Sequence, residues 1–256
     1  MQIFLIPALS DNYIYLLHQP ELDFSLVIDP AEAEPVENFL TSKDWSLDLI
    51  LNTHHHWDHV GGNERLKQTY QCPAWGPRPV PGSPPISSLD RHLREGQLLP
   101  IGQELCQVLE VPGHTLDHIA FYFPQAEALF VGDTLFSVGC GRLFEGSAEQ
   151  MWSSLDKIRL LPRSTKIYCA HEYTLQNIEF ALSVEPQNSA LRRWQSQAQS
   201  LRQSNQPSLP TSLQLELECN PFLRPESEAI RESLGLSAKT SDLEVFRRLR
   251  QLKDQF

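Results

Sequence analysis

The fold is decided by one stretch of this sequence, Thr53-His54-His55-His56-Trp57-Asp58-His59-Val60-Gly61-Gly62-Asn63. It follows the apolar run 49–51 and precedes a segment with helical periodicity, which predicts a loop between a strand and a helix. Alternate residues of an extended loop share a face, so His54 and His56 can bind one ion. Asp58 and His59, beyond the bend, can point at a second. Imidazole suits zinc and iron, and carboxylate adds a harder ligand. We therefore expect a metal site here, and favour it over a solvated histidine-rich loop.

Three more polar residues each follow a predicted strand. They are His114 in Val-Pro-Gly-His-Thr, Asp133 in Phe-Val-Gly-Asp-Thr and His171 in Tyr-Cys-Ala-His-Glu. Each one alone is more typical of a turn or a core residue. Strand ends in α/β proteins present ligands at one edge of a sheet. Together with the loop, these residues give seven candidate ligands at such an edge.

Short apolar runs bounded by turn residues predict strands in the first two-thirds of the chain. These strands are expected at 2–6, 13–17, 25–28, 48–51, 105–111, 119–123, 128–131 and 166–169. Helices are expected at 34–43 and 63–70. A further helix begins at Ser147, where Gln150 completes a capping box, and stops before Pro162. Six prolines between Pro73 and Pro85 predict a rigid surface loop through which no strand or helix runs.

After about His171 glycine nearly vanishes, and glutamine, arginine, leucine and glutamate dominate. Helical periodicity recurs at 177–184, 188–203, 226–234 and 242–255. Strands first and helices later predict an α/β domain over residues 1–171, which would bind the metals, and a smaller all-helical domain over residues 172–256.

Composition limits the class of protein. The chain has 256 residues, 41% of them hydrophobic, and a formal net charge of −11. It can bury a sizeable core, and its acidity disfavours binding to nucleic acid. No apolar run reaches the ~18 residues of a membrane span and no signal peptide is visible, so we expect a cytoplasmic protein without a membrane partner. Five widely spaced cysteines predict buried free thiols in a reducing compartment.

The motifs T-H-x-H-x-D-H-x-G-G-N, P-G-H-T and G-D-T, with a late histidine after a strand, resemble those of the metallo-β-lactamase superfamily. The likeness covers about residues 1–171. It implies an αβ/βα four-layer sandwich with a two-metal site at one edge. It also implies the assignment of the ligands, which are His54, His56 and His114 for the first metal, Asp58, His59 and His171 for the second, and Asp133 for both.

Four further segments resemble the hydroxyacylglutathione hydrolase (glyoxalase II) family and extend the likeness over the whole chain. They are Gly139–Arg142 with Phe144–Gly146, His171–Tyr173, Asn220–Arg224 and Lys253–Phe256. The resemblance implies that the helical domain supplies half of a glutathione site. The substrate-binding residues that it implies are Arg142, Phe144, His171, Tyr173, Arg250 and Lys253.

Within that implied site, Arg250 and Lys253 would bind the glycine carboxylate end of glutathione, and Arg142 and Tyr173 would hold the peptide nearer the metals. Two positions depart from the family. Arg142 stands where many members have lysine, and Phe144 where the animal enzymes have tyrosine. Loss of one neutral hydrogen bond is worth about 0.5–1.5 kcal/mol, which weakens glutathione binding without abolishing it.

The implied reaction is hydrolysis of S-(2-hydroxyacyl)glutathione, chiefly S-D-lactoylglutathione, to D-lactate and glutathione, the second step of methylglyoxal detoxification. A hydroxide activated by two divalent ions would attack the thioester carbonyl, with Asp58 and Asp133 as the catalytic carboxylates. Zinc is the expected metal, and iron and manganese also accept this donor set. A self-contained pair of domains predicts a monomer.

Two other functions remain open. A persulfide dioxygenase of the same superfamily would need one iron, which His59, His114 and Asp133 can hold. A non-catalytic or nucleic-acid-processing relative is disfavoured by the negative charge. The role of His118 is also open, since it can support the metal ligands or be structural. His18 is expected at the surface.

Overall fold

The computed structural model describes residues 1–256. The chain folds into two compact units. The first unit comprises residues 1–110 and 115–132, and the second comprises residues 111–114 and 133–256. None of the helices combines the length and the apolar character that crossing a lipid bilayer requires.

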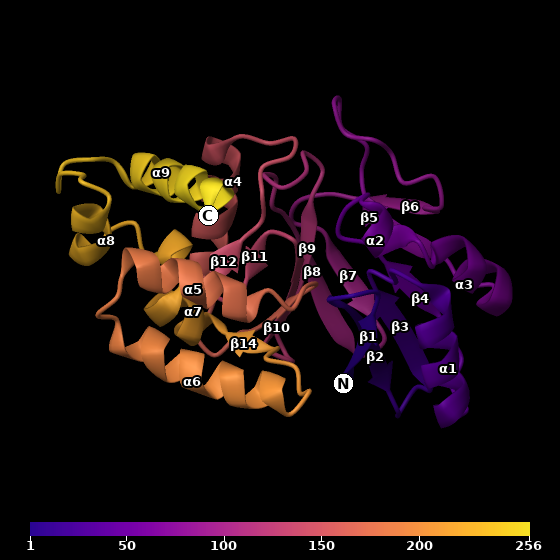
Figure 1. Cartoon of the computed structure of the whole chain (residues 1–256). Helices are drawn as coiled ribbons and strands as arrows, with labels where there is room; N and C mark the ends of the chain where they lie inside the picture. Colours follow the sequence, from indigo (N-terminus) through magenta and orange to yellow (C-terminus); the bar gives the residue numbers. More distant parts are fainter. The chain divides into compact units, whose positions relative to one another are not determined.

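The first unit contains two groups of β-strands, drawn in indigo to magenta in Figure 1. The six-stranded sheet has the order β1-β2-β3-β4-β5-β6, with bounds Gln2–Ala8, Asn12–Gln19, Phe24–Ile28, Leu49–Leu51, Ala74–Pro77 and Arg91–Leu93. Strands β1 to β3 are antiparallel, and β3 to β6 are parallel. The other group is antiparallel in the order β10-β9-β8-β7, with bounds Ala128–Gly132, Ile119–Phe123, Glu104–Glu110 and Leu98–Ile101.

Both faces of the six-stranded sheet are covered within this unit. Its helices are α1, α2 and α3, with bounds Ala33–Lys43, Trp57–Val60 and Asn63–Tyr70. Leu40 of α1 and Leu66 of α3 belong to one buried cluster with Ile14 of β2. On the opposite face, the rings of Tyr15 and Phe130 lie 5.4 Å apart. All eight residues of β2 are buried as a result, and its sequence shows no polar alternation.

The second unit is mainly helical. Its strands form two antiparallel pairs, β11–β12 and β13–β14, with bounds Leu135–Phe136, Gly139–Cys140, Lys166–Cys169 and Thr211–Ser212. Its α-helices α4 to α9 span Ala148–Arg159, Thr174–Val184, Ser189–Gln203, Leu213–Cys219, Glu228–Ser233 and Asp242–Gln255, and a 3₁₀ turn spans Pro221–Leu223. Helix α5 packs against α6, and α9 packs against α4 (Figure 1).

The short β11–β12 turn is held by two side chains from the end of α7. The Val138 amide, in the left-handed region at φ 58°, donates to the Glu216 carboxylate at 2.8 Å. The Asn220 amide group donates to the carbonyls of Phe136 and Gly139 and to the same carboxylate. Burial raises the pKa of Glu216 to about 7, against the opposing effect of these hydrogen bonds. The turn that follows Asp133 is thus fixed by a buried polar pair.

Most predicted elements are confirmed to within a few residues. The strands at 119–123 and 166–169 and the helices at 63–70 and 242–255 match residue for residue. Ser147 and Gln150 form the predicted capping box. All five cysteines are free and buried, also as predicted.

Two predictions are wrong. Strand β5 lies inside the proline-rich stretch, through which no strand was expected to run. It can form because Pro73 comes before it and Pro77 is its last residue, and the Trp75 carbonyl between them accepts a ladder hydrogen bond from the Asn52 amide. His18 is buried, not exposed. Its ring stacks on Trp45 at 3.6 Å, and its Nδ1 lies 3.0 Å from the Ser25 hydroxyl.

Candidate metal ligands and a basic pocket

The loop after β4 brings the predicted ligands of the first unit together. His54 Nε2 lies 3.0 Å from His56 Nδ1, and the second ring nitrogen of His54 lies 3.1 Å from the Thr53 hydroxyl. Two imidazole nitrogens on one tetrahedral zinc ion are about 3.3 Å apart, given Zn–N distances near 2.0–2.1 Å. The spacing of these two nitrogens therefore suits a shared ion.

Asp58 and His59 lie on the short helix α2 beyond the bend. His59 Nε2 lies 3.7 Å from Asp58 Oδ2. The other nitrogen of His59 lies 3.0 Å from Asp29, which also accepts hydrogen bonds from the Thr53 amide and hydroxyl at 2.7 and 2.6 Å. Asn12 donates to both the carbonyl and the carboxylate of Asp58. Both side chains are therefore oriented by buried neighbours, as metal ligands usually are.

The sequence did not predict that Asp29 and Asn12 support the candidate ligands, and Asn12 was expected only to form a turn before a strand. The sequence does contain a pattern that could have identified Asp29. This residue follows the apolar strand β3 directly, as Asp133 follows β10. For Asn12 no signal exists in the sequence. Asn12 stands at the start of β2, and it comes to lie beside Asp58, 46 positions away in the sequence, only when the chain folds.

We expect Asp29→Asn to weaken binding of a divalent ion by about 10- to 100-fold, because the anion that orients His59 is lost. Competition with a chromophoric zinc chelator measures this affinity. Asp48→Asn is the matched control, since Asp48 also accepts a backbone hydrogen bond in the same sheet, from Ser25. Equal zinc affinities for the two variants would contradict a supporting role for Asp29.

Two further histidines of the first unit, His55 and His118, lie beside predicted ligands. His55 Nδ1 lies 3.4 Å from Asp117 and 3.2 Å from the Ser83 hydroxyl. His118 is buried and stacks on His54, with ring centroids 4.6 Å apart. His118 thus contacts a predicted ligand ring, which favours the supporting role over a purely structural one.

Three predicted ligands lie together in the second unit. Asp133 Oδ2 is 3.3 Å from His114 Nε2, and Asp133 Oδ1 is 3.4 Å from His171 Nε2. Each carboxylate oxygen therefore faces a different imidazole, an arrangement compatible with a carboxylate shared between two ions. The other nitrogen of His114 lies 2.8 Å from the Arg142 carbonyl. Gly141 is required here, because a Cβ atom at that position would lie 2.0 Å from the Asp133 carbonyl oxygen.

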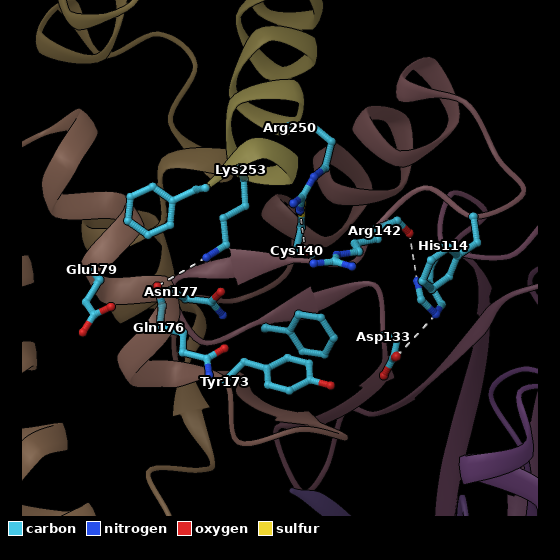
Figure 2. A pocket seen from close by; sticks show the side chains of 13 residues that line it. His114, Asp133, Cys140, Arg142, Tyr173, Gln176, Asn177, Glu179, Arg250 and Lys253 are labelled. Carbon is cyan, nitrogen blue, oxygen red and sulfur yellow. Dashed lines mark hydrogen bonds and ion pairs between the residues drawn. The ribbon is translucent and has the colours of Figure 1, made fainter.

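A pocket of about 560 Å³ begins at His114 and Asp133 within the second unit. Figure 2 shows these two residues at one end of the pocket and Glu179 and Lys253 toward the other, with Arg142 between them. The walls near Asp133 are aromatic. They include the ring of Phe144, 5.2 Å from that of His114, and the ring of Tyr173, which stacks on His171 at 4.8 Å.

The two α9 cations that line the pocket, Arg250 and Lys253, differ in their surroundings. The side chain of Arg250 is only 4% exposed, and its guanidinium donates to the Cys140 carbonyl at 2.8 Å and to Asp254 at 2.9 Å. Lys253 is half-buried and donates to the Gln176 carbonyl at 3.3 Å. Burial and then repulsion from Arg250 and Arg142 lower the pKa of Lys253. The pocket thus combines an imidazole and carboxylate end with a basic wall.

The chain matches two family profiles. The metallo-beta-lactamase superfamily matches residues 10–171, and the hydroxyacylglutathione hydrolase C-terminus matches residues 172–256. The chain is 47% identical to hydroxyacylglutathione hydrolase from Methylococcus capsulatus, over 100% of this chain and 99% of that protein.

Two solved structures are also similar. ETHE1 from Myxococcus xanthus is 25% identical, with a TM-score of 0.69 over 98% of this chain and 91% of the other. TTHA1623, solved in a di-iron-bound form, is 26% identical, with a TM-score of 0.61 over 85% of this chain and 98% of the other. These similarities confirm the predicted fold class, a metallo-β-lactamase sandwich with a helical C-terminal region.

Proposed function

Because the chain belongs to the hydroxyacylglutathione hydrolase family of the metallo-β-lactamase superfamily, we propose that it hydrolyses S-(2-hydroxyacyl)glutathione thioesters. The preferred substrate is S-D-lactoylglutathione, and the products are D-lactate and glutathione. The observation that carries this proposal is the pocket of the second unit, which joins the His114–Asp133 end to a basic wall. The acyl group of the substrate requires the His114–Asp133 end, and the peptide carboxylate of the same substrate requires the basic wall.

Superfamily membership and the His/Asp clusters point to a site for two divalent ions. We propose His54, His56, Asp58 and His59 of the first unit and His114, Asp133 and His171 of the second as its ligands. The mixed nitrogen and oxygen donors suit zinc, which we propose as the resident metal. Iron is the second candidate, because the similar structure TTHA1623 was solved in a di-iron-bound form. Such a pair of ions activates water and polarises a carbonyl group.

The chain's own residues explain the choice of substrate. At neutral pH glutathione carries two carboxylates and one ammonium group. Arg142 and Lys253 supply cations along the pocket, and Glu179 supplies one anion. The rings of Phe144 and Tyr173 pack against those of His114 and His171, and so add apolar surface beside the proposed ligands. We assign Arg142, Phe144, His171, Tyr173, Arg250 and Lys253 to substrate binding.

The leaving group removes one catalytic requirement. A thiol has a pKa near 8.5, so a thiolate leaves without strong help from an acid. The cysteine of the pocket, Cys140, is buried, and burial raises the pKa of its thiol. The pocket thus supplies no acidic thiol to the reaction, and the chemistry needs none.

The decisive experiment measures the metal content of the purified protein and its release of thiol from S-D-lactoylglutathione. We expect two ions per chain and efficient hydrolysis. The proposed function is wrong if the metal-loaded protein leaves the thioester intact. One iron per chain, with oxygen consumed on glutathione persulfide, would instead support the dioxygenase.

We expect Lys253→Ala to raise KM about tenfold and to leave kcat nearly unchanged, because its charge lies far along the pocket from Asp133. Steady-state kinetics on S-D-lactoylglutathione give both constants. Lys239→Ala is the control, since Lys239 is exposed and does not line the pocket. If both variants keep the wild-type KM, Lys253 does not bind the substrate.

The expectations on location, oligomeric state, partner and domain boundary remain proposals. The enzyme would act in the cytoplasm as a monomer, with the small thioester as its partner. The metal-binding domain would end at residue 171 and the glutathione-binding domain would begin at residue 172, where the two family profiles meet.

A further inference from the structure

Lys253 is held in the pocket by aromatic rings. Its ammonium nitrogen lies 5.2 Å from the centroid of Phe180 and 5.3 Å from that of Phe256. The two rings are 5.5 Å apart and nearly perpendicular, at 75°. They therefore form a corner around the ammonium group, and the Gln176 carbonyl accepts one of its hydrogen bonds.

The two rings differ in burial. Phe180 is fully buried in α5, and the ring of Phe222 supports it at 5.8 Å. Phe256 follows the end of α9 and is 64% exposed, so burial of apolar surface accounts for little of its position. Its ring lines the pocket together with Lys253. The contacts that Phe256 makes there are with the ammonium group and with the ring of Phe180.

An aromatic corner keeps the charge of Lys253 available. No carboxylate lies within 4.0 Å of its nitrogen, whereas Arg250, one turn earlier, pairs with Asp254. The face of a ring attracts a cation without neutralising it. It also restricts a flexible side chain that otherwise loses about 2 kcal/mol of rotamer entropy on binding a ligand.

We propose that Phe256, together with Phe180, is a positioning residue that holds the Lys253 ammonium group ready for the anionic end of the bound ligand. The identification of that anion as a glutathione carboxylate rests on the proposed function. The corner itself rests on the distances within the second unit. Phe256 would therefore affect substrate affinity through Lys253.

The test is a double-mutant cycle with Phe256→Leu and Lys253→Ala. Alone, Phe256→Leu is expected to raise KM about two- to fivefold and to leave kcat unchanged, because one cation–π contact is lost. In the Lys253→Ala background it should change nothing further. Phe256→Tyr, which keeps the ring, should restore the wild-type KM. An equal rise in KM in both backgrounds would show that Phe256 acts by packing alone, and would overturn the proposal.

A second measurement does not depend on the substrate. NMR titration of the protein with ¹³C-labelled lysine reports the pKa of Lys253 directly. Loss of the ring destabilises the ammonium form, so Phe256→Leu should lower this pKa further, and Phe256→Tyr should not. An unchanged pKa of Lys253 in Phe256→Leu would refute the proposal that the Phe256 ring holds the ammonium group, even if the enzyme is active. Absence of thioester hydrolysis in the wild type would refute the proposed function and leave this measurement valid.

Discussion

Asp58→Asn and His56→Ala are each expected to reduce kcat on S-D-lactoylglutathione by about a thousandfold or more. Each change removes one proposed metal ligand, and loss of about 4 kcal/mol of transition-state stabilisation corresponds to that factor. The neighbours of both residues predict that the effect is local. Asn12 can still donate to the Asp58 carbonyl, and Thr53 still contacts His54.

Metal analysis and circular dichroism complete this experiment. We expect a wild-type spectrum and fewer than two bound ions per chain. His92→Ala is the matched control, because this histidine is exposed and is not a proposed ligand. A variant of Asp58 or His56 that keeps wild-type kcat with two ions bound would contradict the ligand assignment.

Glu216→Gln is expected to remove a pH dependence of folding stability worth about 3 kcal/mol. The pKa of Glu216 is raised from 4.5 to about 7 in the folded chain, and each unit corresponds to 1.36 kcal/mol. Between these values the folded state keeps a proton that the unfolded state has lost. The contribution of Glu216 to stability is therefore highest below about pH 4.5 and is lost as pH rises to about 7.

Glutamine cannot ionise, and its carbonyl can still accept from Val138 and Asn220. The variant should thus match the wild type near pH 5 and unfold at higher urea concentration near pH 8. Glu218→Gln, an exposed site on the same helix, controls for the loss of charge. Parallel pH profiles for the wild type and Glu216→Gln would show that Glu216 stays ionised in the folded chain.

Short-range patterns in the sequence were sufficient for much of the fold and for the proposed ligands. The loop at 53–63 and helix α9 were predictable because spacing and periodicity determine which residues share a face. Strand β5 was missed because Pro73 precedes it and Pro77 is its last residue, where they cost no ladder hydrogen bond, and composition alone does not reveal these positions.

Supporting residues were harder to predict, because their partners are distant in the chain. Asn12 donates to a residue 46 positions away, and Glu216 accepts from one 78 positions away. Phe256 belongs to a recognised motif, but its role depends on Phe180, a residue of another helix. Arg250 is a further case, because only the fold reveals its surroundings. The resemblance made it a substrate ligand, whereas its guanidinium also bonds the backbone of β12.

The hydrogen bonds that Asn220 donates to the β11–β12 turn, and the one that Glu216 accepts from it, limit how this enzyme can be engineered. The C-terminal helices are not an exchangeable cassette, because they carry internal supports for the backbone between Asp133 and Arg142. A chimaera that borrows these helices to accept a new thiol must also inherit a matching amide and carboxyl group. Otherwise the graft would loosen the turn that joins Asp133, a proposed metal ligand, to Arg142, a proposed substrate ligand.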